Sequence, residues 1–341
     1  MLFAPAAIAA MQQPESEENM PESIEVPITP MRYDIMLPLL EGRIDIPGVM
    51  LKVERGPGAM VFADNPQLRE GDFGLVDLNI GYLPQVIEQD WEVVALPVIS
   101  KRKSVLQFIW VRTDRGIETP KDLEGKTVVA SSYTTGITTM VRGLLLERYG
   151  VDTSTMLWKV DRPDFFTGYT EARVEYWDER KNPLDRLLAG EADLMITDIS
   201  DGRAWETLDA SPEIKLLFPN YPDEDYAIYR EMGIYPPMHL MVMSRKLDRA
   251  HPDLARRLFD AFQRAKDMSI EECLNDRAGF SVLYQRETFL EQRAKWGDPF
   301  AYGLSHDRRM FEAYMRYACE QGQTRTPLAL DSVFAASTLD T

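Results

Sequence analysis

The sequence predicts an α/β protein built as two lobes with an open cleft between them. From residue 31 onward, short runs rich in β-branched and other apolar residues alternate with longer amphipathic runs. Strands that alternate with helices of roughly 10–15 residues are typical of βαβ units and largely parallel sheets. The chain has 341 residues, and at about 100–200 residues per domain it is long enough for two packed domains.

Short apolar runs that end at turn residues predict the strands in the first part of the chain. They lie at residues 49–53, 73–78, 91–98, 107–112 and 126–130. The first follows the turn Pro47-Gly48, and Pro97 closes the third. Pro120 begins a short helix that ends at Gly125, directly before the run Lys126–Ala130.

A longer helix is predicted from about residue 137 to residue 149. One of its faces carries apolar residues at the three- and four-residue spacing of a helix: Ile137, Met140, Val141, Leu144 and Leu145. Gly150 stands where a left-handed C-terminal cap belongs. Asn182-Pro183 supplies the N-cap and the first residue of the next helix, at 184–189.

The alternation continues to the end of the chain. Apolar runs predict strands at residues 193–197, 214–218 and 240–244. His251-Pro252 opens a long amphipathic helix, whose apolar face carries Leu254, Leu258, Ala261, Phe262 and Ala265. A last helix is predicted at residues 311–321.

The first thirty residues are expected to form a disordered leader. Met1–Ala10 is apolar and ends in small residues, but it lacks the basic segment of a secretory signal. Gln12–Glu25 is rich in Pro, Glu and Ser and has too little apolar surface to order itself. A truncated export signal is the alternative for this segment. No apolar run approaches the roughly 18 residues of a membrane span.

The charge and the cysteine content exclude several classes of protein. The chain has 38 Lys and Arg against 55 Asp and Glu, a formal charge of −17. Such an acidic chain argues against a nucleic-acid partner, because binding phosphates requires a basic face. Two cysteines and three scattered histidines exclude a disulfide scaffold, a four-cysteine zinc site and an HExxH site. Neither a GxGxxG nor a P-loop motif is present, so no organic cofactor is indicated.

Two basic or hydrogen-bonding segments could hold a ligand carboxylate. Tyr133, Thr134 and Thr135 end a strand just before a helix, where free backbone N–H groups and the helix dipole attract anions. Plain N-capping is the alternative. Arg102 could grip a carboxylate with two parallel hydrogen bonds, although its Lys neighbours also fit a solvated basic loop.

Two carboxylates follow strands of the predicted sheets. Asp77 comes at the end of the 73–78 strand, and Asp198 follows the 193–197 strand. Ligands of open α/β folds bind at the carboxyl edge of the sheet, so both residues are candidates for contact with a ligand. Capping of the following turn is the alternative for each.

Two segments of the chain resemble the hinge of type II periplasmic-binding proteins. Thr119–Val128 looks like the crossing into the second lobe, and Met243–Leu247, before a helix that starts near Pro252, looks like the return. The resemblance implies lobe one at residues 31–125 plus 238–341 and lobe two at 126–237, with a ligand cleft between them.

Within that superfamily, residues 31–334 resemble the 4,5-dihydroxyphthalate decarboxylases. Gly116–Leu123 is followed by Arg142-Gly143 and Tyr149–Val151 at the expected distances. Leu217–Pro219 precedes Gly233–His239, which is similar to that family's G-I-x-P-x-M-H. The remaining matches lie near the C-terminus: Tyr302-Gly303, Arg308, Tyr317 and Glu320–Gly322.

The chain departs from the family's pattern after the 91–98 strand. The family usually has S-R-x-F-R-H-S there, and this chain keeps the first Arg as Arg102 but has Val105 and Leu106 where the second Arg and the His stand. Asp77 matches a usual Glu, and Asp307 matches an Asn. If the two replaced residues contact substrate in the family, this chain handles a different substrate or performs no chemistry.

The resemblance implies a non-oxidative decarboxylase of a hydroxylated, phthalate-like aromatic carboxylate. His239 would lie beside the cleft at the return crossing, so His239 or Asp77 is expected to donate or relay the proton to the ring. The expected substrate contacts are Arg102, Tyr133, Thr134, Thr135 and Asp198. A divalent ion held by Asp77 and His239 is compatible with this set but not required.

A solute-binding protein without catalytic activity, serving a transporter, is the alternative function. It would close on the same kind of aromatic or carboxylate ligand. The enzyme would act in the cytoplasm, whereas an export signal upstream of Met1 would place the protein in the periplasm. A homo-oligomer is compatible with either function.

Overall fold

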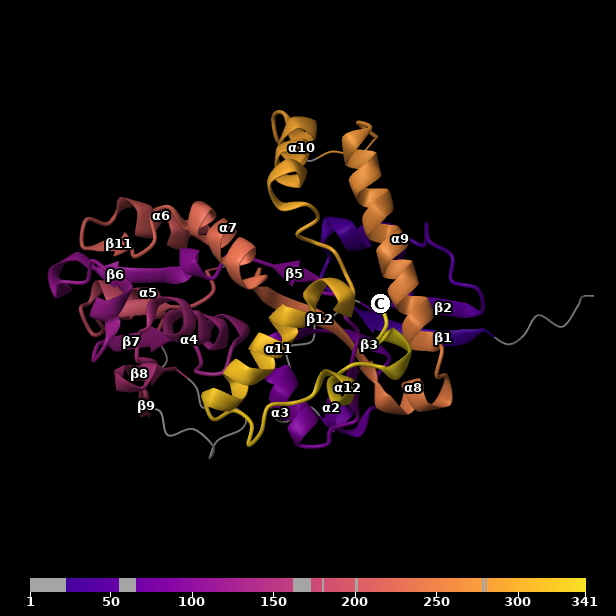
Figure 1. Cartoon of the computed structure of the whole chain (residues 1–341), viewed down its shortest axis with the longest axis horizontal. Helices are drawn as coiled ribbons and strands as arrows, with labels where there is room; N and C mark the ends of the chain where they lie inside the picture. Colours follow the sequence, from indigo (N-terminus) through magenta and orange to yellow (C-terminus); the bar gives the residue numbers. More distant parts are fainter. Residues whose placement is uncertain are drawn as a thin grey trace, which may run out of the picture.

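The computed structural model describes residues 23–54, 66–161, 173–179, 181–199, 202–277, 279 and 281–341. Two six-stranded sheets organise this part of the chain, one on each side of a central crossing (Figure 1). Residues 1–22 of the expected leader lie outside the described residues.

The sheet of lobe one has the order β2-β1-β3-β12-β4, and β5 pairs with β12. β1 is parallel to β2 and β3, whereas β12 runs antiparallel to β3, β4 and β5. Its strands are β1 (Ile24–Thr29), β2 (Val49–Val53), β3 (Leu75–Asn79), β4 (Val93–Ala95), β5 (Lys101–Arg102) and β12 (Pro237–Ser244). Its helical elements are η1 (Asp34–Met36), α1 (Leu37–Leu40), α2 (Pro66–Glu70), η2 (Ile80–Tyr82), α3 (Leu83–Glu88), α8 (Arg245–Ala250), α9 (Leu254–Leu274), α12 (Leu330–Val333) and η7 (Ala336–Thr338).

The sheet of lobe two has the order β11-β6-β10-β7-β8-β9. β6 runs antiparallel to β10 and β11, and the other pairs are parallel. Its strands are β6 (Ile109–Arg112), β7 (Thr127–Ala130), β8 (Leu157–Val160), β9 (Arg173–Tyr176), β10 (Leu194–Ile196) and β11 (Ile214–Leu216). Its helical elements are η3 (Leu106–Phe108), η4 (Thr113–Arg115), η5 (Pro120–Leu123), α4 (Gly136–Tyr149), η6 (Thr153–Thr155), α5 (Pro183–Leu188), α6 (Gly202–Ala210) and α7 (Tyr221–Met232).

The chain crosses between the lobes twice, and the first strand after each crossing is the antiparallel one. β6 follows the outward crossing and β12 follows the return. The expected lobe boundary at residue 125 is therefore too late, because β6 pairs with β10 and β11 in the sheet of lobe two. The expected leader is also too long, because Ile24–Thr29 form β1 beside β2 and β3.

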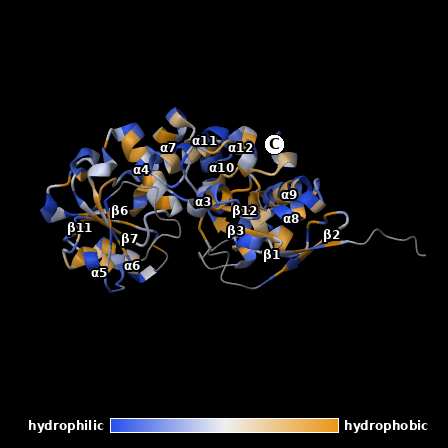
Figure 2. Cartoon of the chain, turned by 90° about the horizontal axis from the view of Figure 1, so that it is seen from below, coloured by the Kyte–Doolittle hydropathy of each residue, from blue (hydrophilic) through white to orange (hydrophobic). Residues whose placement is uncertain are grey.

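Most expected elements occur, with shifted ends. α4 begins one residue before the expected helix and ends at a left-handed Gly150, and the Asn182 side chain caps α5 by accepting from Leu184 N at 3.0 Å. The sequence analysis missed β1, β5, β8, β9, α1, α2, α3, α6, α7, α8, α10 and α12. Figure 2 shows hydrophobic residues gathered on the strands at the centre of each lobe, with hydrophilic residues on the surrounding helices.

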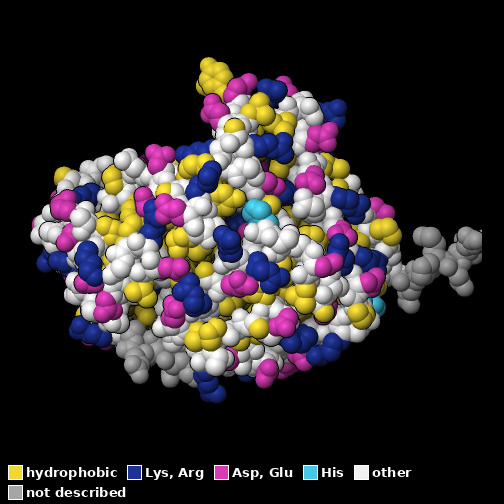
Figure 3. Space-filling model, in the orientation of Figure 1, with side chains coloured by type: hydrophobic (Ala, Val, Ile, Leu, Met, Phe, Trp, Pro, Cys, Tyr) yellow, Lys and Arg dark blue, Asp and Glu magenta, His cyan; other side chains and the backbone are white. Residues whose placement is uncertain are grey.

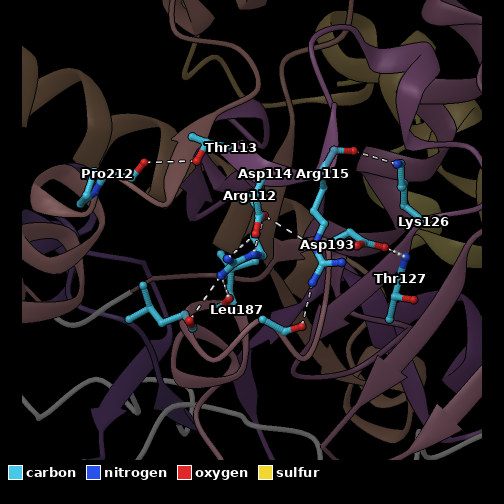
Figure 4. Close-up of polar contacts among 11 residues, drawn as sticks. Arg112, Thr113, Asp114, Arg115, Lys126, Thr127, Leu187, Asp193 and Pro212 are labelled. Carbon is cyan, nitrogen blue, oxygen red and sulfur yellow. Dashed lines mark hydrogen bonds and ion pairs between the residues drawn. The ribbon is translucent and has the colours of Figure 1, made fainter.

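A polar network fastens the end of the lobe-two sheet that lies away from the crossing (Figure 4). The Arg112 guanidinium donates to Asp114 and to the Leu187 carbonyl oxygen, and the Asp193 carboxylate accepts from Thr127 N at 2.8 Å. All of these groups bond within lobe two. A ligand site is therefore expected at the opposite end of the sheet, where β7 and β10 finish.

Two further helices connect the lobes, α10 (Gln285–Trp296) and α11 (Leu304–Glu320). α11 packs against α4, since a Cβ at Gly143 would come within 2.2 Å of the Tyr317 ring. The Arg142 Nε donates to the Gln321 Oε1 at 2.8 Å. Some of the sequence segments that carried the family resemblance, Arg142-Gly143, Tyr317 and Glu320–Gly322, therefore form the contact between α4 and the end of α11. Within the described ranges, no helix combines the length and the hydropathy needed to cross a membrane.

Candidate functional site

The central crossing brings His239 and Asp77 together on adjacent strands of lobe one. His239 lies on β12, in register with Asn79 of β3 and Lys101 of β5. Its Nδ1 is 2.5 Å from Asp77 Oδ1. The Ser100 hydroxyl donates to the other oxygen of the same carboxylate. We refer to His239, Asp77 and Ser100 as the histidine cluster.

The two members of this pair differ in exposure. The Asp77 side chain is 1% exposed and that of His239 is 18% exposed. Because both oxygens of Asp77 are occupied, the carboxylate fixes the orientation of the imidazole. No hydrogen bond to His239 Nε2 occurs among the described residues. The geometry therefore presents Nε2 to a ligand and keeps Asp77 behind it.

Ion pairs cross from lobe one to lobe two beside the histidine cluster. Lys101 Nζ lies 3.5 Å from Asp198 Oδ2, and Lys103 Nζ lies 3.3 Å from Asp198 Oδ1. Lys101 belongs to β5 of lobe one, and Asp198 follows β10 of lobe two. Two ammonium groups therefore share one carboxylate here.

The expected anion site at the start of α4 is occupied by the protein itself. Thr135 Oγ1 accepts from Thr138 N, as an N-cap does, and the Asn79 side chain of lobe one accepts from Gly136 N at 3.0 Å. A Cβ at Gly81 of lobe one would come within 2.3 Å of Thr134 O, so the two backbones are in contact there. Capping, the alternative weighed for this segment, is the arrangement that the structure shows.

Tyr133 and Thr134 are buried, with exposed fractions of 4% and 3%. The Arg142 guanidinium lies 3.6 Å from the centroid of the Tyr133 ring. Trp158 contacts the same ring edge to face at 5.5 Å. Tyr133 therefore belongs to the aromatic packing of lobe two.

Arg102 is engaged within the protein. One terminal nitrogen lies 2.5 Å from Asp307 Oδ2, and the other donates to the Tyr235 carbonyl oxygen at 3.0 Å. The side chains of the ion pair are 1% and 5% exposed. Both terminal nitrogens therefore already have protein partners, and only Nε has no hydrogen-bond partner among the described residues. Val105 and Leu106, which stand where the family has Arg and His, follow Arg102 in the sequence and are buried in the apolar core.

The structure adds polar residues that the sequence analysis did not single out as ligand contacts: Tyr33, Asn79, Ser100, Lys101 and Lys103. Burial, and then the nearby carboxylates of Asp77 and Asp198, raise the pKa of Tyr33 above its usual range. Its phenol therefore stays protonated and can donate a hydrogen bond. Only the lysines carried a sequence signal, as neighbours of Arg102.

A cavity of about 280 Å³ adjoins this region on the side of α9 and α10. Its wall includes Tyr33, Ser100 and Lys101. No cluster of three or more metal-binding side chains occurs among the residues that the structure describes. On the face of the molecule in Figure 3, acidic and basic side chains are interspersed and form no continuous basic tract.

Comparison with known proteins supports the resemblance found in the sequence. No family profile matches the chain. The 4,5-dihydroxyphthalate decarboxylase of Comamonas testosteroni is 24% identical over 327 residues, which cover 93% of this chain and 98% of the relative. That of Pseudomonas putida is 28% identical over 128 residues, 37% of this chain and 48% of the relative.

Solved structures confirm the fold. The periplasmic aliphatic sulphonate binding protein of Escherichia coli has a TM-score of 0.53 at 12% identity, covering 93% of this chain and 99% of its own. A putative periplasmic sulfonate-binding protein of Methylobacillus flagellatus has a TM-score of 0.52 at 12% identity, covering 92% of each chain. The chain has the two-lobed periplasmic-binding-protein fold and is similar in sequence to 4,5-dihydroxyphthalate decarboxylase.

Proposed function

We propose that the protein is a non-oxidative decarboxylase of a hydroxylated, phthalate-like aromatic carboxylate, which protonates the ring carbon between its lobes. The relative from Comamonas testosteroni, which matches over nearly the full length of both chains, supports this reaction class. The single observation that carries the proposal is the histidine cluster, in which a buried carboxylate holds Nδ1 of a partly exposed imidazole and leaves Nε2 without a hydrogen bond among the described residues.

The proposed reaction needs one proton and returns one CO2. A ring hydroxyl donates electron density to the ring carbon that bears the carboxylate, and the N–H of a protonated His239 transfers its proton to that carbon. The bond to the carboxylate then breaks, its electron pair restores the aromatic ring, and CO2 leaves. Asp77 stabilises the imidazolium before transfer, and solvent reprotonates His239 afterwards.

The proposal assigns the anchoring of the substrate to Lys101 and Lys103 together with the Tyr33 hydroxyl. Among the described residues, Asp198 is the carboxylate that pairs with the two ammonium groups, so a ligand carboxylate gains an ion pair there without displacing a buried partner. Asp198 keeps its expected place in the substrate site as the counter-ion that positions both lysines. Arg102, Tyr133, Thr134 and Thr135 support the walls of the site.

The proposed reaction uses no organic cofactor, and a divalent ion between Asp77 and His239 remains compatible with it. We place the enzyme in the cytoplasm. The second candidate function is a solute-binding protein for an aromatic or carboxylate ligand. It is favoured by the sulfonate-binding proteins that share the fold and by the apolar Val105 and Leu106 at the family's Arg and His positions.

Release of CO2 from a panel of hydroxylated phthalates and benzoates tests the proposal. We expect turnover of at least one compound, and a loss of about 10²–10⁴-fold for His239→Ala because a general acid contributes that much. His251→Ala, between α8 and α9, is the matched control and should retain full activity. Tight binding in a thermal-shift assay without any turnover would overturn the enzyme in favour of the binding protein. Full turnover by His239→Ala would overturn the role of this histidine.

A further inference from the structure

α10 joins lobe one to lobe two across the crossing. It follows α9 of lobe one and projects from the body of the molecule (Figure 1). The Trp296 ring at its end packs against Tyr226 and Tyr229 of α7 in lobe two, with centroid distances of 5.2 and 5.4 Å. Lys295 Nζ is 3.1 Å from Asp223 Oδ1 of the same helix. α10 is thus fastened at one end and has no buried residue of its own.

The cavity of about 280 Å³ lies beneath α10. Phe289, Gln292 and Arg293 of α10 form one wall, and Ile270 and Leu274 of α9 form another. This volume is close to the lower end of the range of about 300–1,000 Å³ for ligand pockets, and an apolar cavity of roughly 150 Å³ already admits benzene. A single substituted aromatic ring therefore fits the space and its apolar lining.

The charged groups of the wall favour an anion on the α10 side. The Arg293 guanidinium has no hydrogen-bond or ion-pair partner among the described residues. Of the two wall carboxylates, Asp298 accepts from Lys266 and from Phe300 N. The other, Asp34, is an acceptor suited to a ring hydroxyl. A free guanidinium at the rim of an aromatic-lined cavity suits a carboxylate, which it binds with two parallel hydrogen bonds.

One residue, Ser100, belongs both to the wall of the cavity and to the histidine cluster. Ser100 lines the cavity and donates to Asp77, which holds His239. Lys101 lines it as well and reaches Asp198 across the crossing. Of the three cations that line this space, Arg102 is paired with Asp307, whereas Lys101 and Arg293 stand on different walls of it.

We propose that the cavity beneath α10 receives the substrate's aromatic ring and that Arg293 binds a second carboxylate, which makes the protein selective for aromatic dicarboxylates over monocarboxylates. The inference rests on the proposed function for the identity of the reacting carboxylate. α10 covers the bound ring as a lid, and Trp296 fastens this lid to lobe two. Arg293 determines specificity and transfers no proton.

Replacement of Arg293 tests the inference against a control on the same helix. Arg293→Met removes the charge, and Arg286→Met removes an exposed charge of α10 that does not line the cavity. We expect Arg293→Met to raise KM for a hydroxylated phthalate about 10–100-fold with little change in kcat, because charge-assisted hydrogen bonds to the second carboxylate are lost. KM for a hydroxylated benzoate should change less than about threefold, and Arg286→Met should behave as wild type.

Binding of phthalate, which lacks the activating hydroxyl groups, separates this inference from the proposed function. Calorimetric titration should show about 10–100-fold weaker binding to Arg293→Met than to Arg286→Met, even if no compound is turned over. Equal affinities of the two variants, or equal selectivity in an active enzyme, would overturn the inference and leave decarboxylation standing. Gln292→Trp, which fills the cavity from its exposed side, should abolish phthalate binding while a denaturant titration reports an intact fold. Retained binding by this variant would contradict the placement of the ring.

Discussion

Two buried carboxylates beside the crossing, Asp77 and Asp307, have opposite surroundings. Asp77 holds His239, whose side chain is 18% exposed, whereas Asp307 holds Arg102, whose side chain is 1% exposed. Both pairs meet the same strand, because Arg102 is in register with Pro237 of β12 and Lys101 is in register with His239. The two carboxylates differ in their partners. The His239 ring is partly exposed and can contact a ligand, whereas the Arg102 side chain is buried.

This contrast separates a stabilising pair from a reactive one. A buried Arg–Asp pair is held by its mutual charge and both terminal nitrogens of Arg102 have protein partners, so the pair fixes the start of α11 against β5. A histidine held from behind by a carboxylate keeps its other ring nitrogen for a ligand. Burial of the carboxylate is common to both pairs and therefore says nothing about function by itself.

Asp77→Asn should have the largest effect, and that effect should be on activity. The amide keeps the size of the side chain but favours the wrong tautomer of His239 and no longer stabilises the imidazolium, so we expect kcat/KM to fall about 10²–10⁴-fold. Steady-state CO2 release measures the loss, with Ser100→Ala as a milder variant on the same carboxylate. Activity of Asp77→Asn within threefold of wild type would remove Asp77 from the mechanism.

Asp307→Leu should have the next largest effect, and that effect should be on stability. It leaves the Arg102 charge buried without a counter-ion, so we expect the free energy of unfolding to fall by about 3–5 kcal/mol. The double variant Arg102→Met/Asp307→Leu should recover most of this loss, because an apolar pair carries no desolvation cost. Urea unfolding measures both, and a loss below about 1 kcal/mol for the single variant would show that the pair is open to solvent.

The sequence predicted the fold better than it predicted which polar side chains near the crossing are paired with one another. Periodicity and caps located elements such as α4, because those signals are local. The expected lobe boundary missed β6, since its pairing with β10 and β11 is a long-range contact. The sequence singled out both His239 and Asp77, which the structure brings into contact. The engagement of Arg102 by Asp307, in contrast, depends on a residue 205 positions away. The cap that Asn79 places on α4 likewise joins the two lobes and left no local signal.

A third buried carboxyl group, Asp225 of α7, has no ion-pair partner within the part of the chain that the structure describes. It shows what burial does to a carboxyl group without a cation beside it. Burial raises the pKa of Asp225 to about 6, against a hydrogen bond from Ser104. Between about pH 4 and pH 6 the folded chain binds this proton and the unfolded chain does not, so its contribution to stability falls as the pH rises through that window. Above about pH 6 the buried charge costs up to about 3 kcal/mol.

Asp225→Asn removes this cost without changing the size of the side chain. At about pH 7.5 the variant should be more stable than wild type by about 2–3 kcal/mol, and the difference should vanish as the pH falls to about 4. Urea unfolding of both proteins across this range measures the difference and cancels the other titrating groups. A difference that stays constant with pH would show that Asp225 keeps an ordinary pKa.

Asp198→Asn should have the smallest effect, and its sign distinguishes two roles. The Asp198 side chain is 34% exposed, so loss of its ion pairs should cost less than about 1 kcal/mol of stability. As a counter-ion, Asp198 competes with the ligand for Lys101 and Lys103, so the variant should bind phthalate about two- to fivefold more tightly at low salt. If Asp198 instead accepts a hydrogen bond from a ring hydroxyl, affinity for a hydroxylated phthalate should fall and that for phthalate should stay the same. Calorimetric titration with the two ligands distinguishes these roles. It shows whether Asp198 only pairs with protein cations, as Asp307 does, or takes part in ligand recognition, as is proposed for the Asp77–His239 pair.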